Sequence, residues 1–347
     1  MRHEKESEFL IVGHGLAGAL MTDALERHGQ KPIVADALLE HAASPAAAGI
    51  MNPIIGPSLN SPWRAYDCLK KAKETYRRLE EDWDEYFFRE LRMLRIFKDE
   101  KMIRRWNQKL LQEETAQFLG RLWSKEELEE IGVDGPFGAG EVMKAGALDV
   151  MTLVRASRER LKTEGRYLQK AVHPMDRTWN GRTIFCEGFR VVNNPWFKEL
   201  PFAPAKGEVL ELEDTRKEFL NGGTWFIPGD KDTALAGSTY EWKNLESGPT
   251  REGVYEILNG LNYLSEPKPV IKGQRSGVRP ATRDRMPIVG AHPIEEKMLI
   301  FNGFGSRGSS LIPLCAELFA SHLIEGKELP EAIDLQRFKE AKSLGLP

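Results

Sequence analysis

The sequence predicts an α/β (α+β) protein in which a domain built on a parallel sheet is interrupted by a second domain with an antiparallel sheet and helices. Three observations predict this fold. A buried strand, a glycine turn and a helix open the chain, strands and helices alternate again after about residue 140, and residues 205–240 have the turns and alternation of antiparallel strands. A chain of 347 residues is long enough for two such domains.

The first forty residues carry the most informative motif. An apolar strand is followed by Gly13, Gly15 and Gly18 in the spacing Gly-x-Gly-x-x-Gly, and then by a helix. In this spacing the first glycine permits a tight turn, the second lets a pyrophosphate approach the backbone, and the third lets the helix pack on the strand. A second apolar strand, 32–35, ends at Asp36, where a carboxylate can accept hydrogen bonds from a ribose diol. The motif therefore predicts a dinucleotide site.

Small residues fill the segment 44–53, which follows the second strand. A nicotinamide dehydrogenase would normally continue with a further strand-helix-strand unit, and this sequence does not. Two interpretations stay open for the segment. It is either a tight loop before a helix or a stretch of backbone that passes close to the far part of an extended cofactor.

Residues 63–109 combine apolar residues at steps of three or four with many charges, a pattern that predicts helices. Fourteen basic and ten acidic residues between 64 and 109 leave four net positive charges. This excess is typical of a solvated helix face, and an RNA-contacting surface is the alternative.

Alternation of strand and helix returns in the second half of the chain, where Asp149 is placed to cap a helix over 149–162. Further helices are expected at 125–131, 251–264 and from the glycine-serine loop 302–310 to 323. The expected strands are 140–145, 167–172, 183–186, 207–212, 223–228, 233–240 and 298–301. Glycine-marked turns are expected at 277–290. The division into domains assigns 1–62, 145–200 and 270–347 to the first domain, and 63–144 and 201–269 to the second.

Composition narrows the class of protein. The net charge of −3 gives no general case for nucleic acid or for an acidic membrane. Three cysteines at wide spacing, Cys68, Cys186 and Cys315, indicate a reducing compartment rather than a disulfide framework, and no metal-ligand cluster surrounds them. The polar start of the chain and the short apolar run after it do not suit a signal peptide or a membrane span. We therefore expect a soluble, cytoplasmic protein without a metal.

Taken together, these motifs resemble those of the flavin-dependent amine oxidases of the D-amino-acid-oxidase type. The segment 44–51, Ser-Pro-Ala-Ala-Ala-Gly-Ile-Met, looks like the segment beside the flavin in glycine oxidase. The segments 277–290, 305–308 and 313–317 are similar to the oxidoreductase half of the bifunctional bacterial enzyme that completes 5-methylaminomethyl-2-thiouridine in tRNA. The resemblance runs from about residue 8 to 325 and implies a Rossmann-like FAD-binding domain interrupted by a substrate domain.

The resemblance also implies roles for individual residues. It implies that the substrate carboxylate pairs with Arg279, with Arg307 nearby, because a guanidinium presents a planar fork to a carboxylate. Trp225 and Tyr240 take positions in the pocket wall; core packing is the alternative for both, and a structural ion pair is the alternative for either arginine. The implied FAD contacts are Gly13, Gly15, Leu16, Ala17, Gly18, Asp36, Ala37, Ser44, Val172 and Gly188, with the isoalloxazine between Ala48, Gly49 and Ile50 on one side and Gly305, Ser306, Arg307, Gly308 and Ser309 on another.

The sequence departs from the family pattern in three ways. Asp36 stands where the family more often has glutamate, which the ribose role tolerates. The methyltransferase half of the bifunctional enzyme is absent, so at most the oxidative step is expected. Cys315 lies inside the last helix, and no cysteine stands where the family attaches flavin covalently, so the resemblance implies dissociable FAD.

The resulting hypothesis is an FAD-dependent amine or amino-acid oxidase or dehydrogenase. Because the chain has one dinucleotide fingerprint, the electrons are expected to come from the substrate rather than from NAD(P)H. A small carboxylated amine would dock on Arg279 and pass hydride to the flavin, the imine would hydrolyse, and O2 or another electron acceptor would reoxidise the flavin.

Two alternatives stay open. One is oxidative trimming of a carboxymethylaminomethyl group on the wobble uridine of tRNA, which the C-terminal motifs favour and the acidic net charge disfavours. The other is a flavoprotein that acts as an interaction module without turnover.

Overall fold

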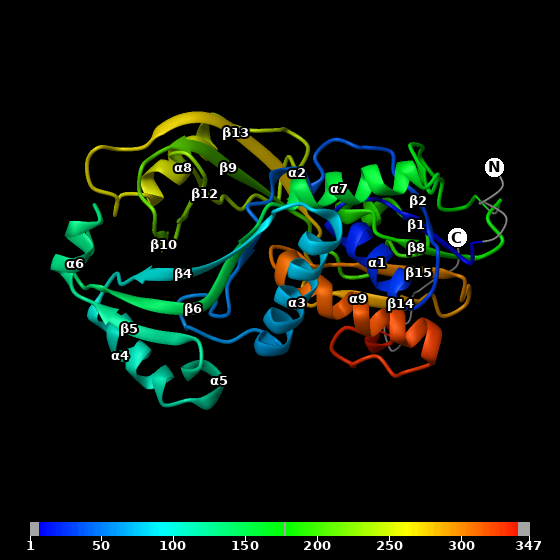
Figure 1. Cartoon of the computed structure of the whole chain (residues 1–347), viewed down its shortest axis with the longest axis horizontal. Helices are drawn as coiled ribbons and strands as arrows, with labels where there is room; N and C mark the ends of the chain where they lie inside the picture. Colours follow the sequence, from blue (N-terminus) through cyan, green and yellow to red (C-terminus); the bar gives the residue numbers. More distant parts are fainter. Residues whose placement is uncertain (1–6, 177, 339–347) are drawn as a thin grey trace.

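The computed structural model describes residues 7–176 and 178–338, and within them the strands form two sheets (Figure 1). The ends of the first predicted domain, 1–6 and 339–347, lie outside the described residues. The six-stranded sheet has the order β14-β15-β8-β1-β2-β7. Its strands are β1 (Phe9–Val12), β2 (Ile33–Ala35), β7 (Tyr167–Leu168), β8 (Arg182–Phe185), β14 (Ile288–Ala291) and β15 (Met298–Asn302).

The nine-stranded sheet has the order β13-β9-β12-β11-β10-β4-β6-β3, and β5 also pairs with β6. Its strands are β3 (Ile50–Met51), β4 (Phe88–Ile96), β5 (Leu119–Trp123), β6 (Ala139–Leu148), β9 (Ala205–Glu213), β10 (Phe219–Asn221), β11 (Trp225–Pro228), β12 (Thr233–Gly237) and β13 (Val270–Arg279). All its pairs are antiparallel except β10 with β4. The predicted α/β fold with a second, mainly antiparallel sheet is confirmed.

The helices cover the two sheets in different ways. In Figure 1, α1, α7 and α9 lie along the six-stranded sheet, and α4, α5 and α6 lie at the far end of the nine-stranded sheet. The α-helices are α1 (Leu16–Arg27), α2 (Ala43–Ala46), α3 (Ala65–Trp83), α4 (Glu100–Leu110), α5 (Glu113–Ala116), α6 (Lys125–Glu130), α7 (Val150–Thr163), α8 (Arg251–Gly260) and α9 (Gly308–Glu325); η2 (Gly188–Asn193) and η3 (Leu335–Phe338) are 3-10 helices.

The first strand owes its continuous apolar sequence to its place in the sheet. All four residues of β1 are buried, and the strand pairs in parallel with β2 on one side and β8 on the other. A central parallel strand is covered on both faces, so it reads as an apolar run rather than as an alternation. The predicted order of strand, glycine turn and helix is therefore the core of the first domain.

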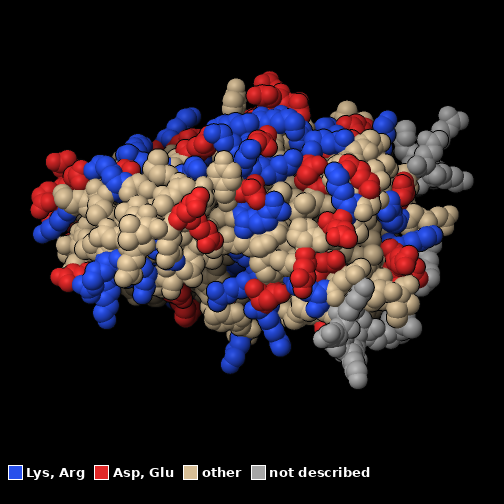
Figure 2. Space-filling model, turned by 90° about the horizontal axis from the view of Figure 1, so that it is seen from below, with Lys and Arg blue, Asp and Glu red and all other residues tan. Residues whose placement is uncertain are grey.

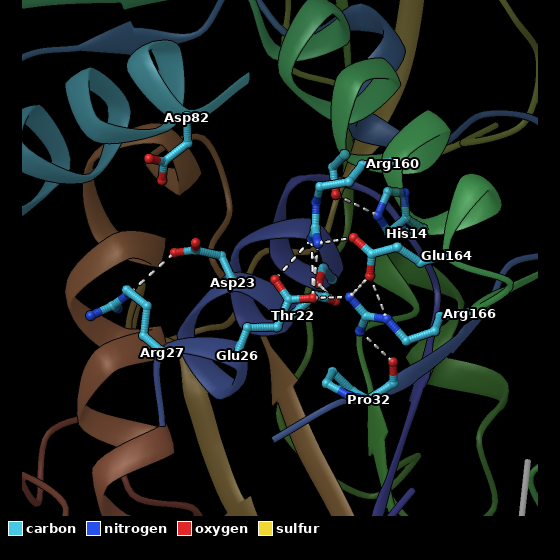
Figure 3. A network of polar contacts seen from close by, with 12 residues as sticks. His14, Thr22, Asp23, Glu26, Arg27, Pro32, Asp82, Arg160, Glu164 and Arg166 are labelled. Carbon is cyan, nitrogen blue, oxygen red and sulfur yellow. Dashed lines mark hydrogen bonds and ion pairs between the residues drawn. The ribbon is translucent and has the colours of Figure 1, made fainter. Parts of the chain in front are cut away.

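Ion pairs attach helix α7 and the segment after it to helix α1. Figure 3 shows Arg160 and Arg166 converging on the carboxylates of Glu26 and Glu164. Arg160 Nη2 donates to Glu26 Oε2 at 2.8 Å, Arg166 also pairs with Glu26, and Arg166 Nη1 donates to the carbonyl oxygen of Pro32 at 2.9 Å. The Arg166 side chain is nearly buried, with 8% of it exposed, so its donors depend on these partners.

Two sequence expectations are corrected by the strand pairing. Residues 63–109 do not form helices throughout, because β4 lies between α3 and α4 and pairs with β6 and β10. The stripe from Leu69 to Leu79 is the buried face of α3, as the periodicity indicates, but the charges of residues 88–96 belong to a strand. A helical repeat and a half-buried strand give similar patterns over a few residues.

The predicted domain boundary at 270 also differs from the pairing. Strand β13 pairs with β9 over its whole length, so 270–279 belong to the second sheet, as do Ile50 and Met51 of β3. The expected strand 167–172 is shorter than predicted, since β7 contains only Tyr167 and Leu168. Strands β10, β13 and β14 were not predicted, because short or glycine-rich strands carry little alternation.

We predict that Arg166→Met lowers the free energy of unfolding by about 2 kcal/mol, because hydrogen bonds to charged groups of a nearly buried side chain are lost. Chemical denaturation followed by far-UV circular dichroism measures the loss. Arg155→Met is the matched control: Arg155 lies on α7, is 63% exposed and pairs with Glu85 at 3.6 Å. Its removal should change stability by less than about 0.5 kcal/mol, and equal losses in the two variants would contradict the role of the network.

Candidate active site

A cavity of about 530 Å³ opens where the carboxyl ends of β1, β2 and β8 meet the second sheet. Open α/β sheets bind ligands at this edge. Of the residues predicted to bind cofactor or substrate, those that line the cavity are Gly13, Gly15, Leu16, Ala17, Asp36, Ala37, Ser44, Ala48, Gly49, Ile50, Val172, Gly188, Trp225, Arg279, Gly305, Ser306, Gly308 and Ser309. The structure therefore brings together residues separated by almost 300 positions in the sequence.

The glycine turn is shaped by close backbone contacts. Gly13 has a φ of +94°, and a Cβ added to Gly18 would lie 2.0 Å from the carbonyl oxygen of Gly13. Helix α1 therefore approaches strand β1 at a distance that only glycine allows. Gly15 is the N-cap residue without a side-chain cap, and the backbone N–H of Leu16 donates to Ser44 Oγ at 3.0 Å. The unpaired N–H groups of this helix end suit a pyrophosphate.

Asp36 lies at the end of β2, at one side of the cavity. Its Oδ2 accepts a hydrogen bond from the Tyr167 hydroxyl at 3.2 Å and is 3.7 Å from a guanidinium nitrogen of Arg158. The Arg158 Nε is buried and has no hydrogen-bond partner among the residues that the structure describes. A polar ligand is the natural partner for such an atom, so this side of the cavity suits the sugar and base of a nucleotide.

His14, within the glycine turn, stays uncharged. Its Nε2 lies 3.1 Å from Ser157 Oγ, and its ring meets the Tyr167 ring edge to face. Burial, with smaller contributions from Arg158 and Arg160, lowers the pKa of His14 to about 3. The turn therefore presents backbone N–H groups, and not an imidazolium, to a ligand.

The segment Ala48-Gly49-Ile50 passes along the cavity where the two sheets join. Gly49 has a φ of +65°, and a Cβ added there would lie 1.8 Å from the carbonyl oxygen of Leu148. The carbonyl oxygen of Gly49 accepts a hydrogen bond from Leu148 N at 3.0 Å. The geometry favours the second interpretation of segment 44–53, because small side chains leave its backbone open to a flat ring.

Arg279 projects from the end of β13 into the cavity. Its Nη1 donates to the carbonyl oxygens of Lys206 at 3.3 Å and Thr239 at 3.2 Å, and its Nη2 donates to Ser238 Oγ at 2.7 Å. These bonds use at most three of the five N–H donors of a guanidinium, and two donors suffice for a bidentate contact with a carboxylate. Within 7–176 and 178–338, no Asp or Glu lies within ion-pairing distance of Arg279.

The Arg279 guanidinium is held between a backbone and a ring. A Cβ added to Gly207 would lie 2.2 Å from Arg279 Cζ, so glycine provides the space that the guanidinium occupies. The centroid of the Tyr240 ring lies 4.2 Å from Arg279 Cζ. Burial lowers the pKa of Arg279, but arginine stays protonated at neutral pH. The cavity therefore contains a fixed positive charge that lacks a counter-ion in the described protein.

Three predicted site residues do not line the cavity. Gly18 packs beneath Gly13, and Tyr240 supports Arg279 from the side. Arg307 precedes helix α9, and its Nη2 donates to the carbonyl oxygen of Arg285. Its neighbours Ser306 and Gly308 line the cavity, but Arg307 does not, and its side chain contacts that carbonyl. Its expected place near the substrate stays a prediction.

Sequence reasoning missed several residues that line the cavity. They are Arg158, Lys170, Glu187, Arg190, Gly207 and Ser238, among others. Glu187 follows a predicted buried strand directly, so its place at a carboxyl strand end was a usable signal. Arg158 carries no such signal, because its approach depends on how α7 packs.

The fold and the site define an FAD-dependent oxidoreductase. The close glycine contacts, the open end of α1, the acid after β2 and the unpartnered Arg158 Nε fit the ADP part of the cofactor, and segment 48–50 fits its flat ring. The chain belongs to the DAO family of FAD-dependent oxidoreductases, whose model matches residues 8–322. FAD is therefore its cofactor.

Curated relatives match at low identity. The bifunctional protein MnmC of tRNA 5-methylaminomethyl-2-thiouridine biosynthesis from Idiomarina loihiensis is 25% identical over 345 residues, which cover 90% of this chain and 55% of the relative. Glycine oxidase from Bacillus subtilis is 25% identical over 166 residues, 45% of this chain and 44% of that protein. The chain thus matches about half the length of these relatives.

Solved structures share the fold. Glycine oxidase from Geobacillus kaustophilus has a TM-score of 0.80 at 19% identity, covering 98% of this chain and 99% of that one. Iminodiacetate oxidase from Chelativorans sp. BNC1 has a TM-score of 0.78 at 19% identity, covering 93% and 97%. At these identities the likeness establishes the architecture.

Other expectations concern membranes, metals and thiols. In the described part of the chain, none of the helices combines the length and apolar character that crossing a membrane requires. Nor do three His, Cys, Asp or Glu side chains of these residues come together as a metal site would need. Cys315 is a buried free thiol inside α9, and burial raises its pKa.

We predict that Gly49→Ala reduces FAD content to less than about a tenth of the wild-type level, because the new Cβ must displace the Leu148 carbonyl beside the ring site. The ratio of flavin to protein absorbance in the purified protein measures the loss. Gly56→Ala is the matched control, since Gly56 has nearly the same φ, +66°, but no atom within 4 Å of its added Cβ. Full FAD content in both variants would argue against the ring site.

Proposed function

We propose that the protein oxidises the C–N bond of a small amine that carries a carboxylate, such as an amino acid or an N-substituted glycine. The main support for the proposal is the position of Arg279 in the cavity. Its guanidinium is a fixed positive charge with unused N–H donors and no counter-ion among the described residues. The names of the relatives and structural neighbours, glycine oxidase and iminodiacetate oxidase, refer to amines of this kind.

The chain's own residues would bind and orient the amine. Arg279 holds the carboxylate, and Ser238, Gly207 and Tyr240 fix the direction of its guanidinium. Trp225 lines the cavity from β11 and excludes water from one side. FAD supplies the acceptor for two electrons when it is bound. Loss of two electrons and a proton from the amine gives an iminium product, which water hydrolyses to a carbonyl compound and an amine or ammonia. We expect O2 or another electron acceptor to complete the cycle.

We predict that Arg279→Ala raises KM for carboxylated amines about a hundredfold and KM for uncharged amines by less than about threefold, because truncating one partner of a buried charge pair costs 2–5 kcal/mol. Steady-state kinetics with glycine, sarcosine and simple alkylamines provide the comparison. Arg275→Ala is the control, since Arg275 lies on the same strand but outside the cavity lining. An equal effect on both amine classes would exclude a carboxylate role for Arg279.

A second candidate substrate is a carboxymethylaminomethyl group on tRNA, whose glycine-like end suits the same arginine. Two observations favour it: the MnmC relative aligns with 90% of this chain, and an exposed aromatic ring, Tyr240, lies beside Arg279 with a second, Trp242, next to it. Tyr240 is 49% exposed and Trp242 67% exposed, with ring centroids 6.3 Å apart. Exposed aromatic rings can stack on unpaired bases.

The charge distribution gives tRNA less support than the sequence count suggested. Figure 2 shows lysine and arginine side chains gathered near the middle of one face, with acidic side chains among them. On α3, four of the basic residues are in ion pairs: Lys71 with Glu317, Lys73 with Glu90, Arg77 with Glu80 and Arg78 with Asp23. Cations that are already paired contribute less to phosphate binding.

We predict that free glycine or sarcosine reduces the bound flavin, and that Trp242→Ala leaves KM for these amines within about twofold of the wild-type value, because the exposed Trp242 ring does not line the cavity. Anaerobic absorbance at about 450 nm, a property of the cofactor, gives the readout. Reduction only by modified tRNA, and its loss in Trp242→Ala, would instead favour the tRNA reaction.

A further inference from the structure

Glu187 occupies an unexpected place for an acidic residue. It follows β8 directly and lines the cavity that also contains Gly15 and Ser44. A Cβ added to Gly13 would lie 2.6 Å from the carbonyl oxygen of Cys186 and 3.4 Å from Glu187 Cα. The backbone of Glu187 therefore packs against the glycine turn that fits a pyrophosphate, a group with two negative charges.

The carboxyl group of Glu187 has a single neutral partner. Asn194 Nδ2 donates to Glu187 Oε2 at 2.7 Å, and Asn194 is itself buried, with its Oδ1 accepting a hydrogen bond from Trp196 N at 3.0 Å. No ion pair joins Glu187 to a Lys, Arg or His of residues 7–176 and 178–338. An amide donor serves a neutral acid as well as a carboxylate, so it does not compensate a charge.

Among the described residues, no cation of the elements around Glu187 lies within ion-pairing distance of its carboxyl group. Their titratable or charged groups are His14, Asp36, Arg158, Lys170, Cys186, Arg190 and His292. His14 is neutral, and burial lowers the pKa of His292 and raises that of Cys186. The guanidinium of Arg158 lies 3.7 Å from Asp36, and that of Arg190 lies 3.8 Å from Glu246.

Burial therefore acts on Glu187 almost unopposed. It raises the pKa of Glu187 to about 7, against the smaller opposite effect of the Asn194 hydrogen bond. An anionic ligand in the same cavity raises that pKa further, since like charges disfavour ionisation. A neutral carboxyl group keeps an O–H donor and avoids this repulsion.

We propose that Glu187 is a neutral carboxylic acid when FAD is bound, so that cofactor binding takes up a proton from solvent and weakens as the pH rises above neutrality. The proton moves from water to the Glu187 carboxylate, and no other bond changes. The proposal concerns the family's cofactor and is independent of which amine is oxidised.

The sign of the pH dependence follows from linkage. At pH 6 and below the carboxyl is almost fully protonated with and without FAD, so affinity is greatest and nearly constant. Above pH 7 the FAD-free protein loses the proton while the loaded protein keeps it, and affinity falls until the pKa of the loaded protein is passed. With a carboxyl pKa near 7 in the FAD-free protein, Kd for FAD should rise about tenfold between pH 6 and pH 8.

The test measures FAD affinity rather than turnover. The full-length holoprotein is diluted stepwise from pH 6 to pH 8 at constant ionic strength, and free flavin is read from its fluorescence. Glu187→Gln keeps the shape of the side chain and cannot ionise, so its Kd should stay within about twofold across this range, near the wild-type value at pH 6. Glu40→Gln is the matched control: Glu40 also lines the cavity, but its side chain is 90% exposed, and the tenfold dependence should persist.

Two outcomes would overturn the proposal. One is a wild-type Kd that is the same at pH 6 and pH 8, and the other is a Glu187→Gln variant that keeps the wild-type dependence. Calorimetry of FAD binding to the wild-type apoprotein in two buffers of different ionisation enthalpy keeps the test valid if the variant does not fold. Uptake of about half a proton to one proton per FAD at pH 7.5 supports the proposal, and uptake near zero contradicts it.

Discussion

The backbone contact between Gly49 and Leu148 is the constraint on which the cavity depends. At this point the chain leaves the cofactor side, enters β3 and pairs with β6 of the second sheet. The separation between the two backbones leaves no room for a Cβ at Gly49. The contact therefore fixes the path of the backbone that lines the cavity at Gly49, and backbone atoms relax less than side chains do.

The electrostatics of the cavity follow from the same arrangement. The open N-terminus of α1 and the Arg279 guanidinium both attract anions. Helix α1 follows β1 of the six-stranded sheet, whereas Arg279 ends β13 of the nine-stranded sheet. Each positive site suits a separate negative group, one on the cofactor and one on the substrate. Glu187 is an exception to this pattern, because burial without a cation beside its carboxyl group favours the neutral form.

The sequence predicted the features whose cause is local. The glycines at 13, 15 and 18 are recognisable by their spacing, and a positive φ at Gly13 and a backbone contact at Gly18 explain two of them; Asp36 is recognisable because strand ends face the ligand. The fold class was predictable for the same reason. Strand β4 was mistaken for helix because its residues fit both periods and only pairing with β6 and β10 decides between them. The direction of a side chain could not be predicted from the sequence. The Arg307 side chain contacts a carbonyl oxygen, and Arg158 reaches the cavity from a face of helix α7.

The parallel pair between β10 and β4 has a consequence for biosynthesis. It joins residues 93–95 to residues 219–221, so two segments of the second sheet pair although residues 145–200, assigned to the first domain, lie between them in the sequence. Until β10 has left the ribosome, β4 is an unpaired edge carrying exposed N–H and C=O groups. Charged side chains on an edge strand disfavour association through that edge, and β4 carries four, Arg89, Glu90, Arg92 and Arg95. Their value to the protein thus includes solubility during synthesis, before any cofactor can bind.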